Sequence, residues 1–133
     1  MERTGEWEKE LVGMARAAAK EAYCPYSHYP VGAAVLAEDG TVFTGCNVEN
    51  ASYGLCNCAE RTAVFKAVSE GRRAFSAIAI AGGTKSPASP CGACRQVLSE
   101  FCRPETVVLI TTLRGRKIIR TTLGELLPLS FAL

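Results

Sequence analysis

Two short cysteine-bearing segments constrain the fold of this chain more than any other feature. A Cys-Ala-Glu run occupies residues 58–60, and a Pro-Cys-Gly-Ala-Cys run occupies residues 90–94. Cys91 and Cys94 stand three positions apart, so they point to one side of a first helical turn. Cys58, from the distant segment, completes a set of three thiolates. Any fold for this chain must therefore bring the two segments together.

The expected ligand set has the composition of a catalytic zinc site. Catalytic zinc keeps three protein ligands and leaves the fourth position to water, whereas structural zinc takes four protein ligands. Glu60 stands two residues from Cys58, near enough to face such a water and too poorly placed to be an obvious ligand. We therefore expect Glu60 to act as a general acid and base. One alternative stays open, in which Cys56 closes a purely structural site and leaves Glu60 without a role.

The residue after Glu60 is expected to adjust the charge of this site. Three thiolates around one dication leave a net negative charge, which weakens the metal as a Lewis acid. We predict that Arg61 donates hydrogen bonds to one or two ligand sulfurs and so withdraws charge from them. Both cysteine segments should also begin helices, where free N–H groups and the helix dipole favour thiolates. The alternative for Arg61 is an ordinary exposed arginine on a helix.

The remaining pattern predicts alternating helices and strands. Apolar residues at helical spacing predict a helix over 6–22, and a Glu-Asp-Gly turn at 38–40 predicts a hairpin between two apolar runs. A polar loop at 47–57 should lead to a second helix from residue 58 to a stop at Gly71. The other expected elements are hairpin strands at 31–36 and 42–46, strands at 75–81, 106–111 and 118–121, and helices at 91–101 and 123–127. This order predicts a three-layer α/β/α domain with a mixed sheet of about five strands.

Length and charge narrow the classes of protein further. A chain of 133 residues fits a single domain spanning residues 1–133. The net charge of +2 does not describe a polyanion-binding surface, so no nucleic acid partner is expected. A basic cluster around Gly115 is interpreted as a solvated hairpin rather than a phosphate track; its members are Arg114, Arg116, Lys117 and Arg120.

The chain is expected to work in the cytoplasm, away from membranes. No apolar run reaches the length that crosses a bilayer, and residues 1–10 are charged where a secretory signal would be apolar. The seven cysteines are an odd number, which argues against a disulfide framework. The four outside the ligand set are expected to be buried or partly buried free thiols: Cys24, Cys46, Cys56 and Cys102.

Several long segments resemble the small, homotetrameric class of cytidine deaminases. The match includes Gly-Cys-Asn-Val-Glu-Asn-Ala-Ser-Tyr at 45–53, the run from Cys58 to Gly71, and Ser-Pro-Cys-Gly-Ala-Cys-Arg-Gln-Val at 89–97, with shorter matches at 23–27, 30–34 and 125–128. Cysteine or histidine followed by Glu and then by Pro-Cys-x-x-Cys is the signature of zinc-dependent nucleobase deaminases. The resemblance covers almost the whole chain.

That resemblance implies a mechanism and a set of partners. One Zn²⁺ per subunit would be held by Cys58, Cys91 and Cys94, with Glu60 moving protons and Arg61 offsetting the thiolate charge. The implied reaction is hydrolytic deamination of free cytidine and 2′-deoxycytidine to uridine and 2′-deoxyuridine with release of ammonia, in pyrimidine salvage. The implied assembly is a homotetramer.

The resemblance also implies residues that contact the nucleoside. Asn47 and Glu49 would bind the ribose 3′-hydroxyl, since an amide and a carboxylate two apart on an extended segment can reach one hydroxyl. The alternative is that both only stabilise their loop. Ala59 belongs to the implied substrate contacts. Tyr29 stands where the family usually has a phenylalanine against the base or sugar, which changes the polarity of that contact.

Two further aromatic residues are implied at the edge of the pocket. Phe131 would close it from the C-terminal tail, although a core position in the terminal segment is an equal alternative. Tyr53 would be contributed to the active site of a neighbouring subunit. The only histidine, His28, is expected to be a surface loop residue without a role.

Two other functions remain open at this point. Deaminases of the cytosine-containing antibiotic blasticidin S share the zinc and glutamate pattern, although the Asn-Val-Glu run at 47–49 and the Cys-Ala-Glu-Arg run at 58–61 favour the nucleoside. Polynucleotide editing, or RNA binding without chemistry, would require an extended basic face and clustered exposed aromatic residues, which the sequence does not indicate.

Overall fold

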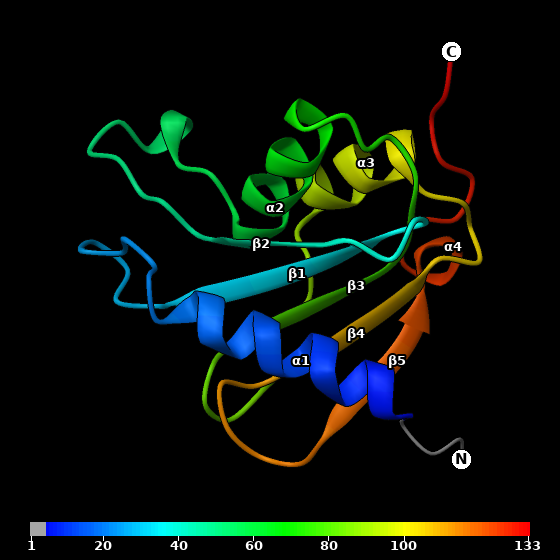
Figure 1. Cartoon of the computed structure of the whole chain (residues 1–133). Helices are drawn as coiled ribbons and strands as arrows, with labels where there is room; N and C mark the ends of the chain where they lie inside the picture. The colour runs from blue at the N-terminus through cyan, green and yellow to red at the C-terminus, as the bar shows by residue number, and fades with distance from the viewer. Residues whose placement is uncertain (1–4) are drawn as a thin grey trace.

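A computed structural model describes residues 5–133 and contains one mixed sheet. Its five strands run in the order β2-β1-β3-β4-β5, with β3 and β4 parallel and the other neighbours antiparallel (Figure 1). The strands are β1 (Val31–Ala37), β2 (Val42–Cys46), β3 (Phe75–Gly82), β4 (Val107–Thr111) and β5 (Ile118–Thr122). The helices are α1 (Glu6–Ala19), α2 (Ala59–Ser69), α3 (Gly92–Phe101) and α4 (Leu123–Leu126), with a short 3₁₀ turn, η1 (Tyr53–Leu55).

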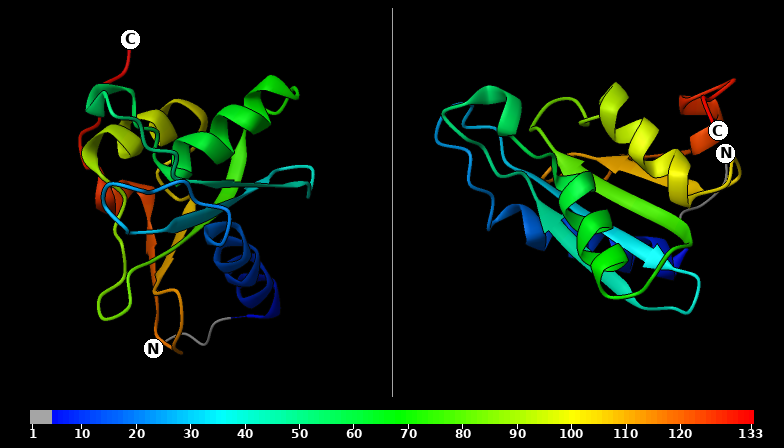
Figure 2. Two further views of the ribbon diagram at one scale, coloured as in Figure 1. Left: turned by 90° about the vertical axis from the view of Figure 1, so that its left-hand side faces the viewer. Right: turned by 90° about the horizontal axis from the view of Figure 1, so that it is seen from above.

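The helices cover both faces of the sheet. Helix α1 lies across one face, and α2 and α3 lie side by side on the other (Figures 1 and 2). Each face has its own cluster of buried apolar side chains. The central strands β1 and β3 contribute to both clusters, because their alternate residues point to opposite faces. The predicted three-layer α/β/α domain with a mixed sheet is confirmed.

Two glycines allow helices to touch the sheet backbone directly. A Cβ on Gly32 in β1 would lie 1.9 Å from the carbonyl oxygen of Ala15 in α1. A Cβ on Gly45 in β2 would lie 2.4 Å from the backbone nitrogen of Ala63 and 2.8 Å from the carbonyl oxygen of Ala59, both in α2. No side chain fits at either contact, so the backbone of α1 packs directly against β1 and the backbone of α2 packs directly against β2.

Helix α1 is shorter than the sequence pattern predicted. It ends at Ala19, whereas apolar spacing had predicted a helix to residue 22. The next residues make tighter turns with bonds to carbonyls three positions back. The chain then pairs with the 47–49 segment, because the N–H of Tyr23 donates to the carbonyl of Asn47 and the N–H of Glu49 donates to the carbonyl of Tyr23. Pairing between the two loops therefore ends the helix.

The structure also describes the remaining cysteines and the histidine. The four cysteines outside the predicted ligand set are free and partly buried. His28 is exposed in a loop, with a positive φ of 55°. No helix within residues 5–133 combines the length and apolar character that a membrane crossing requires.

Candidate functional site

The three predicted ligand cysteines lie together at the start of two neighbouring helices. Cys58 is the N-cap residue of α2 and Cys91 is the N-cap residue of α3, with Cys94 in the first turn of α3. The Cys58 and Cys91 sulfurs are 3.9 Å apart, and the Cys91 and Cys94 sulfurs are 3.3 Å apart. All three lie within 4.8 Å of one another. The structure therefore brings together the two cysteine segments, as the sequence predicted.

The geometry of the thiols fits zinc. Tetrahedral zinc with Zn–S bonds of about 2.3 Å places its sulfurs about 3.8 Å apart. Cys56 does not join the cluster, because its sulfur instead contacts the backbone of Asn50, at 3.3 Å from the nitrogen and 3.6 Å from the oxygen. Among the residues that the structure describes, the thiol group has three members. The closed four-cysteine site is therefore not formed, and the donor set is that of an open zinc site.

Arg61 donates to the cluster as predicted. Its Nη2 lies 3.2 Å from the Cys58 sulfur, one turn further along α2. The pKa of Cys58 falls to about 5 because Cys94 and Arg61 both donate hydrogen bonds to its sulfur. The shared hydrogen bond raises the pKa of Cys94, since that thiol keeps the proton it donates. Thiolate character is thus concentrated on the cysteine that the arginine touches.

Glu60 places a carboxyl group beside the thiols in a buried position. It is only 5% exposed, and burial raises the pKa of its carboxyl above the ordinary glutamate value. The neighbouring charge of Cys58 acts in the same direction. A carboxyl with a raised pKa can both take and return a proton near neutrality.

A pocket in front of the thiols brings most of the predicted site together. It has a volume of about 200 Å³, enough for a base with part of a sugar. Its lining comes from the β1 entry, the 47–49 segment, the α2 start, β3 and the loop before α3: Tyr29, Val31, Asn47, Cys58, Ala59, Glu60, Ile80, Ala88, Ser89 and Cys91. Most of the lining is apolar, and Cys58, Glu60 and Cys91 are part of it.

Asn47 holds the wall of this pocket in place. Its Oδ1 accepts from the N–H of Val31 at 2.8 Å, and its Nδ2 donates to the carbonyl of Tyr29 at 2.9 Å. The amide thereby fixes the backbone that carries Tyr29. It lines the pocket as well, so the loop-stabilising bonds are formed, and a contact with the nucleoside stays a prediction.

Three predicted substrate residues are not in this pocket. Glu49 accepts from the N–H groups of Tyr26 and Ser27, at 3.0 and 3.1 Å, and from the Ser27 hydroxyl. Glu49 lines a separate hollow with Tyr53, whose ring meets that of Tyr26 edge-on at 6.2 Å between centroids. Tyr53 is 75% exposed. These contacts place Glu49 and Tyr53 on the outer surface of the described chain.

Phe131 also lies outside the pocket. Its side chain is 70% exposed, and its carbonyl accepts a hydrogen bond from Gln96 at 3.3 Å. The tail that carries it extends away from the sheet beyond α4 (Figure 1). The alternative interpretation of Phe131 as a core residue is therefore wrong.

The structure adds pocket residues that sequence reasoning missed. Val31 and Ile80 form apolar floor at the sheet, and Ala88 and Ser89 approach from the loop before α3. Ser89 was close to the motif and could have been suspected, because it lies two residues before Cys91. Ile80 carries no such indication, since a buried isoleucine of a central strand is typical of any sheet.

The comparisons with known proteins agree with this geometry. Residues 5–111 match the family model described as the cytidine and deoxycytidylate deaminase zinc-binding region. The chain is 53% identical over 124 residues to a cytidine deaminase from Sporosarcina psychrophila, which covers 93% of this chain and 90% of the relative. It is 55% identical over 121 residues to a cytidine deaminase from Halalkalibacterium halodurans, covering 91% of each.

A solved structure extends the similarity to three dimensions. A cytidine deaminase from Burkholderia pseudomallei superimposes with a TM-score of 0.88 at 53% identity, covering 92% of this chain and 98% of that one. A more distant relative bears on substrate choice. A blasticidin-S deaminase from Bacillus cereus is 32% identical over 130 residues, covering 92% of this chain and 90% of the relative. This identity is lower than the 53% and 55% identity to the two cytidine deaminases above.

Proposed function

Because the chain belongs to the cytidine and deoxycytidylate deaminase family, we propose that it hydrolyses cytidine and 2′-deoxycytidine to the uridine products and ammonia. The observation that supports this most is the convergence of three thiols and a buried carboxyl at the end of an apolar pocket. The pocket, of about 200 Å³, would take the base and part of the sugar of a nucleoside. Products of this reaction feed pyrimidine salvage.

Cys58, Cys91 and Cys94 would hold the zinc ion. When bound, Zn²⁺ lowers the pKa of a water ligand from about 16 to about 7, so that a nucleophile exists at neutral pH. Arg61 withdraws charge from the Cys58 sulfur through its hydrogen bond and keeps the three-thiolate site from becoming too electron-rich.

Glu60 carries the protons of the reaction. Its carboxylate takes a proton from the attacking water and gives it to N3 of the base as the new C4–O bond forms. It next takes the proton of the new C4 hydroxyl and gives it to the amino group, whose bond to C4 breaks as ammonia leaves. Burial of Glu60 supports this role, because it keeps the carboxyl basic enough to accept a proton and excludes bulk water.

The remaining contacts divide between one chain and its neighbours. Asn47, Ala59 and Tyr29 line the pocket and would bind the sugar and base. Glu49 would turn to the ribose 3′-hydroxyl when the sugar is present. Tyr53 and Phe131 are exposed, and in a homotetramer each would reach a pocket, Tyr53 that of a neighbouring subunit.

We also propose that residues 1–133 form one deaminase domain that acts in the cytoplasm. Seven cysteines without a disulfide among them suit a reducing compartment.

The test compares Glu60→Gln with wild type by the loss of cytidine absorbance in the ultraviolet. Turnover should fall by about 10²- to 10⁴-fold while the zinc content stays at one equivalent. Glu100→Gln, at an exposed position of α3, is the matched control and should retain wild-type turnover. Near-wild-type rates in Glu60→Gln would remove Glu60 from the mechanism.

Two further measurements address the alternative functions. We expect kcat/KM for cytidine to exceed that for blasticidin S, and the reverse order would assign the site to the antibiotic. Retention on single-stranded nucleic acid at physiological salt would instead support the polynucleotide function.

A further inference from the structure

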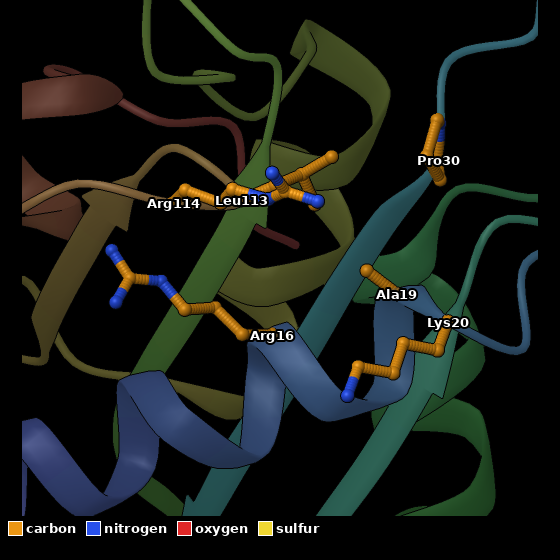
Figure 3. Close-up of a pocket in the computed structure, with 6 residues that line it drawn as sticks. All are labelled: Arg16, Ala19, Lys20, Pro30, Leu113 and Arg114. Carbon is orange, nitrogen blue, oxygen red and sulfur yellow. The ribbon is translucent and has the colours of Figure 1, made fainter.

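A second pocket lies on the α1 side of the sheet and is lined by cations. Its volume is about 190 Å³. Figure 3 shows its lining: Arg16 and Ala19 from α1, Lys20 directly after it, Leu113 and Arg114 from the segment after β4, and Pro30. Three positively charged residues thus line one recess with apolar walls, and their charged ends point in different directions (Figure 3). The proposed reaction uses none of them.

The cations of this pocket have no carboxylate partner among the residues that the structure describes. No carboxylate among residues 5–133 forms an ion pair with Arg16, Lys20 or Arg114. Other arginines are paired, as Arg72 is with Asp39 at 3.2 Å and Arg120 is with the buried Glu8 at 3.1 Å. Positive charge therefore remains available at the pocket to an anion from solution.

The pocket is held in shape before any ligand binds. Arg16 donates from Nε to the carbonyl of Thr112 at 3.1 Å, and from Nη2 to the Thr111 hydroxyl at 3.1 Å and the Gly115 carbonyl at 2.6 Å. Gly115 has a positive φ of 106°, which fixes the turn next to Arg114 in a conformation that favours glycine. These bonds occupy Nε and Nη2 of Arg16, so Nη1 is the donor left for an anion, and an arginine held in this way loses little freedom on binding.

A groove of further cations continues from the same arginine. Arg16 also lines an adjoining hollow with Lys9 and Arg116. Lys9 and Arg16 lie seven residues apart on one face of α1, and Lys20 follows directly after its last residue, four positions from Arg16. The sequence alone favoured a solvated hairpin for the cations after β4, because it could not show that these three lie near them.

We propose that this pocket binds the phosphate group of a small phosphate ester. The arginine and lysine donors match phosphate oxygens, and Ala19, Pro30 and Leu113 offer apolar surface to the organic part. The volume admits a sugar phosphate and excludes a folded macromolecule. Inorganic phosphate shares the anionic chemistry, and the test separates it from the ester.

The site has a structural connection to the substrate pocket. Pro30 lines the basic pocket, while its neighbours Tyr29 and Val31 line the substrate pocket. The N–H of Leu113 donates to the carbonyl of Gly83 at 2.9 Å, and a Cβ on Gly83 would lie 2.5 Å from the Tyr29 hydroxyl. The two pockets therefore share a wall.

The test is a calorimetric titration of the zinc-loaded full chain with ribose 5-phosphate and with inorganic phosphate, at low salt where charge contacts are least screened. The double variant Lys20→Gln/Arg114→Gln removes two exposed cations and leaves Arg16 to hold the turn. The matched control Arg73→Gln/Arg103→Gln removes the same charge from exposed positions outside the pocket.

We expect the pocket variant to bind ribose 5-phosphate about tenfold more weakly than wild type, which corresponds to about 1.4 kcal/mol. The control should stay within about twofold of wild type. Tighter binding of the ester than of inorganic phosphate assigns the pocket to esters, and equal binding assigns it to free phosphate. Equal affinity of wild type and pocket variant, equal weakening in the control, or no binding to wild type would overturn the proposal. Cytidine turnover of both variants checks that each is folded.

Discussion

The contact between Gly45 and helix α2 makes a precise prediction about how the site is positioned. In Gly45→Ala the new Cβ would lie 2.4 Å from the Ala63 nitrogen and 2.8 Å from the Ala59 carbonyl oxygen. Ordinary contact begins near 3.4 Å, so α2 must retreat from β2 by about 1 Å. The atoms in the way are backbone, and rotamer changes cannot relieve the contact.

The displacement has two separate consequences. Overpacking of this kind costs about 1–3 kcal/mol of unfolding free energy. Retreat of α2 also carries Cys58 and Glu60 away from the α3 cysteines and from the pocket, and a misplacement of about 1 Å costs on the order of 10²-fold in turnover. Zinc affinity should fall with it, because the thiol set no longer closes around one centre.

The assay combines urea unfolding, competition with a zinc chelator and cytidine turnover. Gly13→Ala is the matched control, since a Cβ on Gly13 of α1 meets nothing within 4 Å, and it should stabilise the chain by about 0.5–1 kcal/mol. If Gly45→Ala kept wild-type stability, zinc affinity and turnover, backbone contact with β2 would not position the site. If it lost stability but kept both zinc affinity and turnover, only the positioning argument would fail.

Three other perturbations follow from the site. Arg61→Gln should weaken zinc binding or turnover by about 10- to 100-fold, with unchanged unfolding at neutral pH, and wild-type values for both would show the sulfur contact to be without effect. In metal-free protein, Cys58, with a pKa near 5, should be alkylated rapidly at pH 7 and slowly only below pH 5. Bound zinc should protect this thiol from alkylation. Mass spectrometry of the modified peptides measures both effects. Cys102, whose pKa burial raises to about 12, should react slowly in both forms up to pH 10, so fast labelling there would contradict its burial. Asn47→Ala removes two bonds to the backbone flanking Pro30 and should cost about 1–3 kcal/mol together with a raised KM for cytidine, whereas an unchanged KM would limit Asn47 to a loop role.

Much of the architecture could be predicted because local patterns and tertiary structure agree. The strands, the hairpin turn and the starts of the two metal-bearing helices all fall where the residues indicate, since burial and helix capping are encoded nearby in the sequence. Helix α1 is the exception at its C-terminal end. Its apolar spacing continues past Ala19, but Tyr23 forms backbone hydrogen bonds with the 47–49 segment. A local sequence pattern cannot predict a partner that lies so far along the chain.

The residues of the candidate site also fall into those that the sequence could predict and those that it could not. The thiols and Glu60 follow from motif chemistry, and their convergence could be required in advance. Glu49 could not be placed, because its carboxylate is engaged by Ser27, a residue that becomes its neighbour only through the pairing of two loops. Tyr53 and Phe131 are exposed in this chain, so a pocket role for either residue stays a prediction.

The direct backbone contacts of α1 with Gly32 and of α2 with Gly45 have a mechanical consequence. Where helix and strand touch through peptide groups at Gly32 and Gly45, there is no compressible void and no side chain that can change rotamer. Hydrostatic pressure acts chiefly on internal voids, so it should change the spacing between helix and strand at these two contacts very little. The layered scaffold therefore behaves as a rigid frame that keeps the metal-binding residues at their separation.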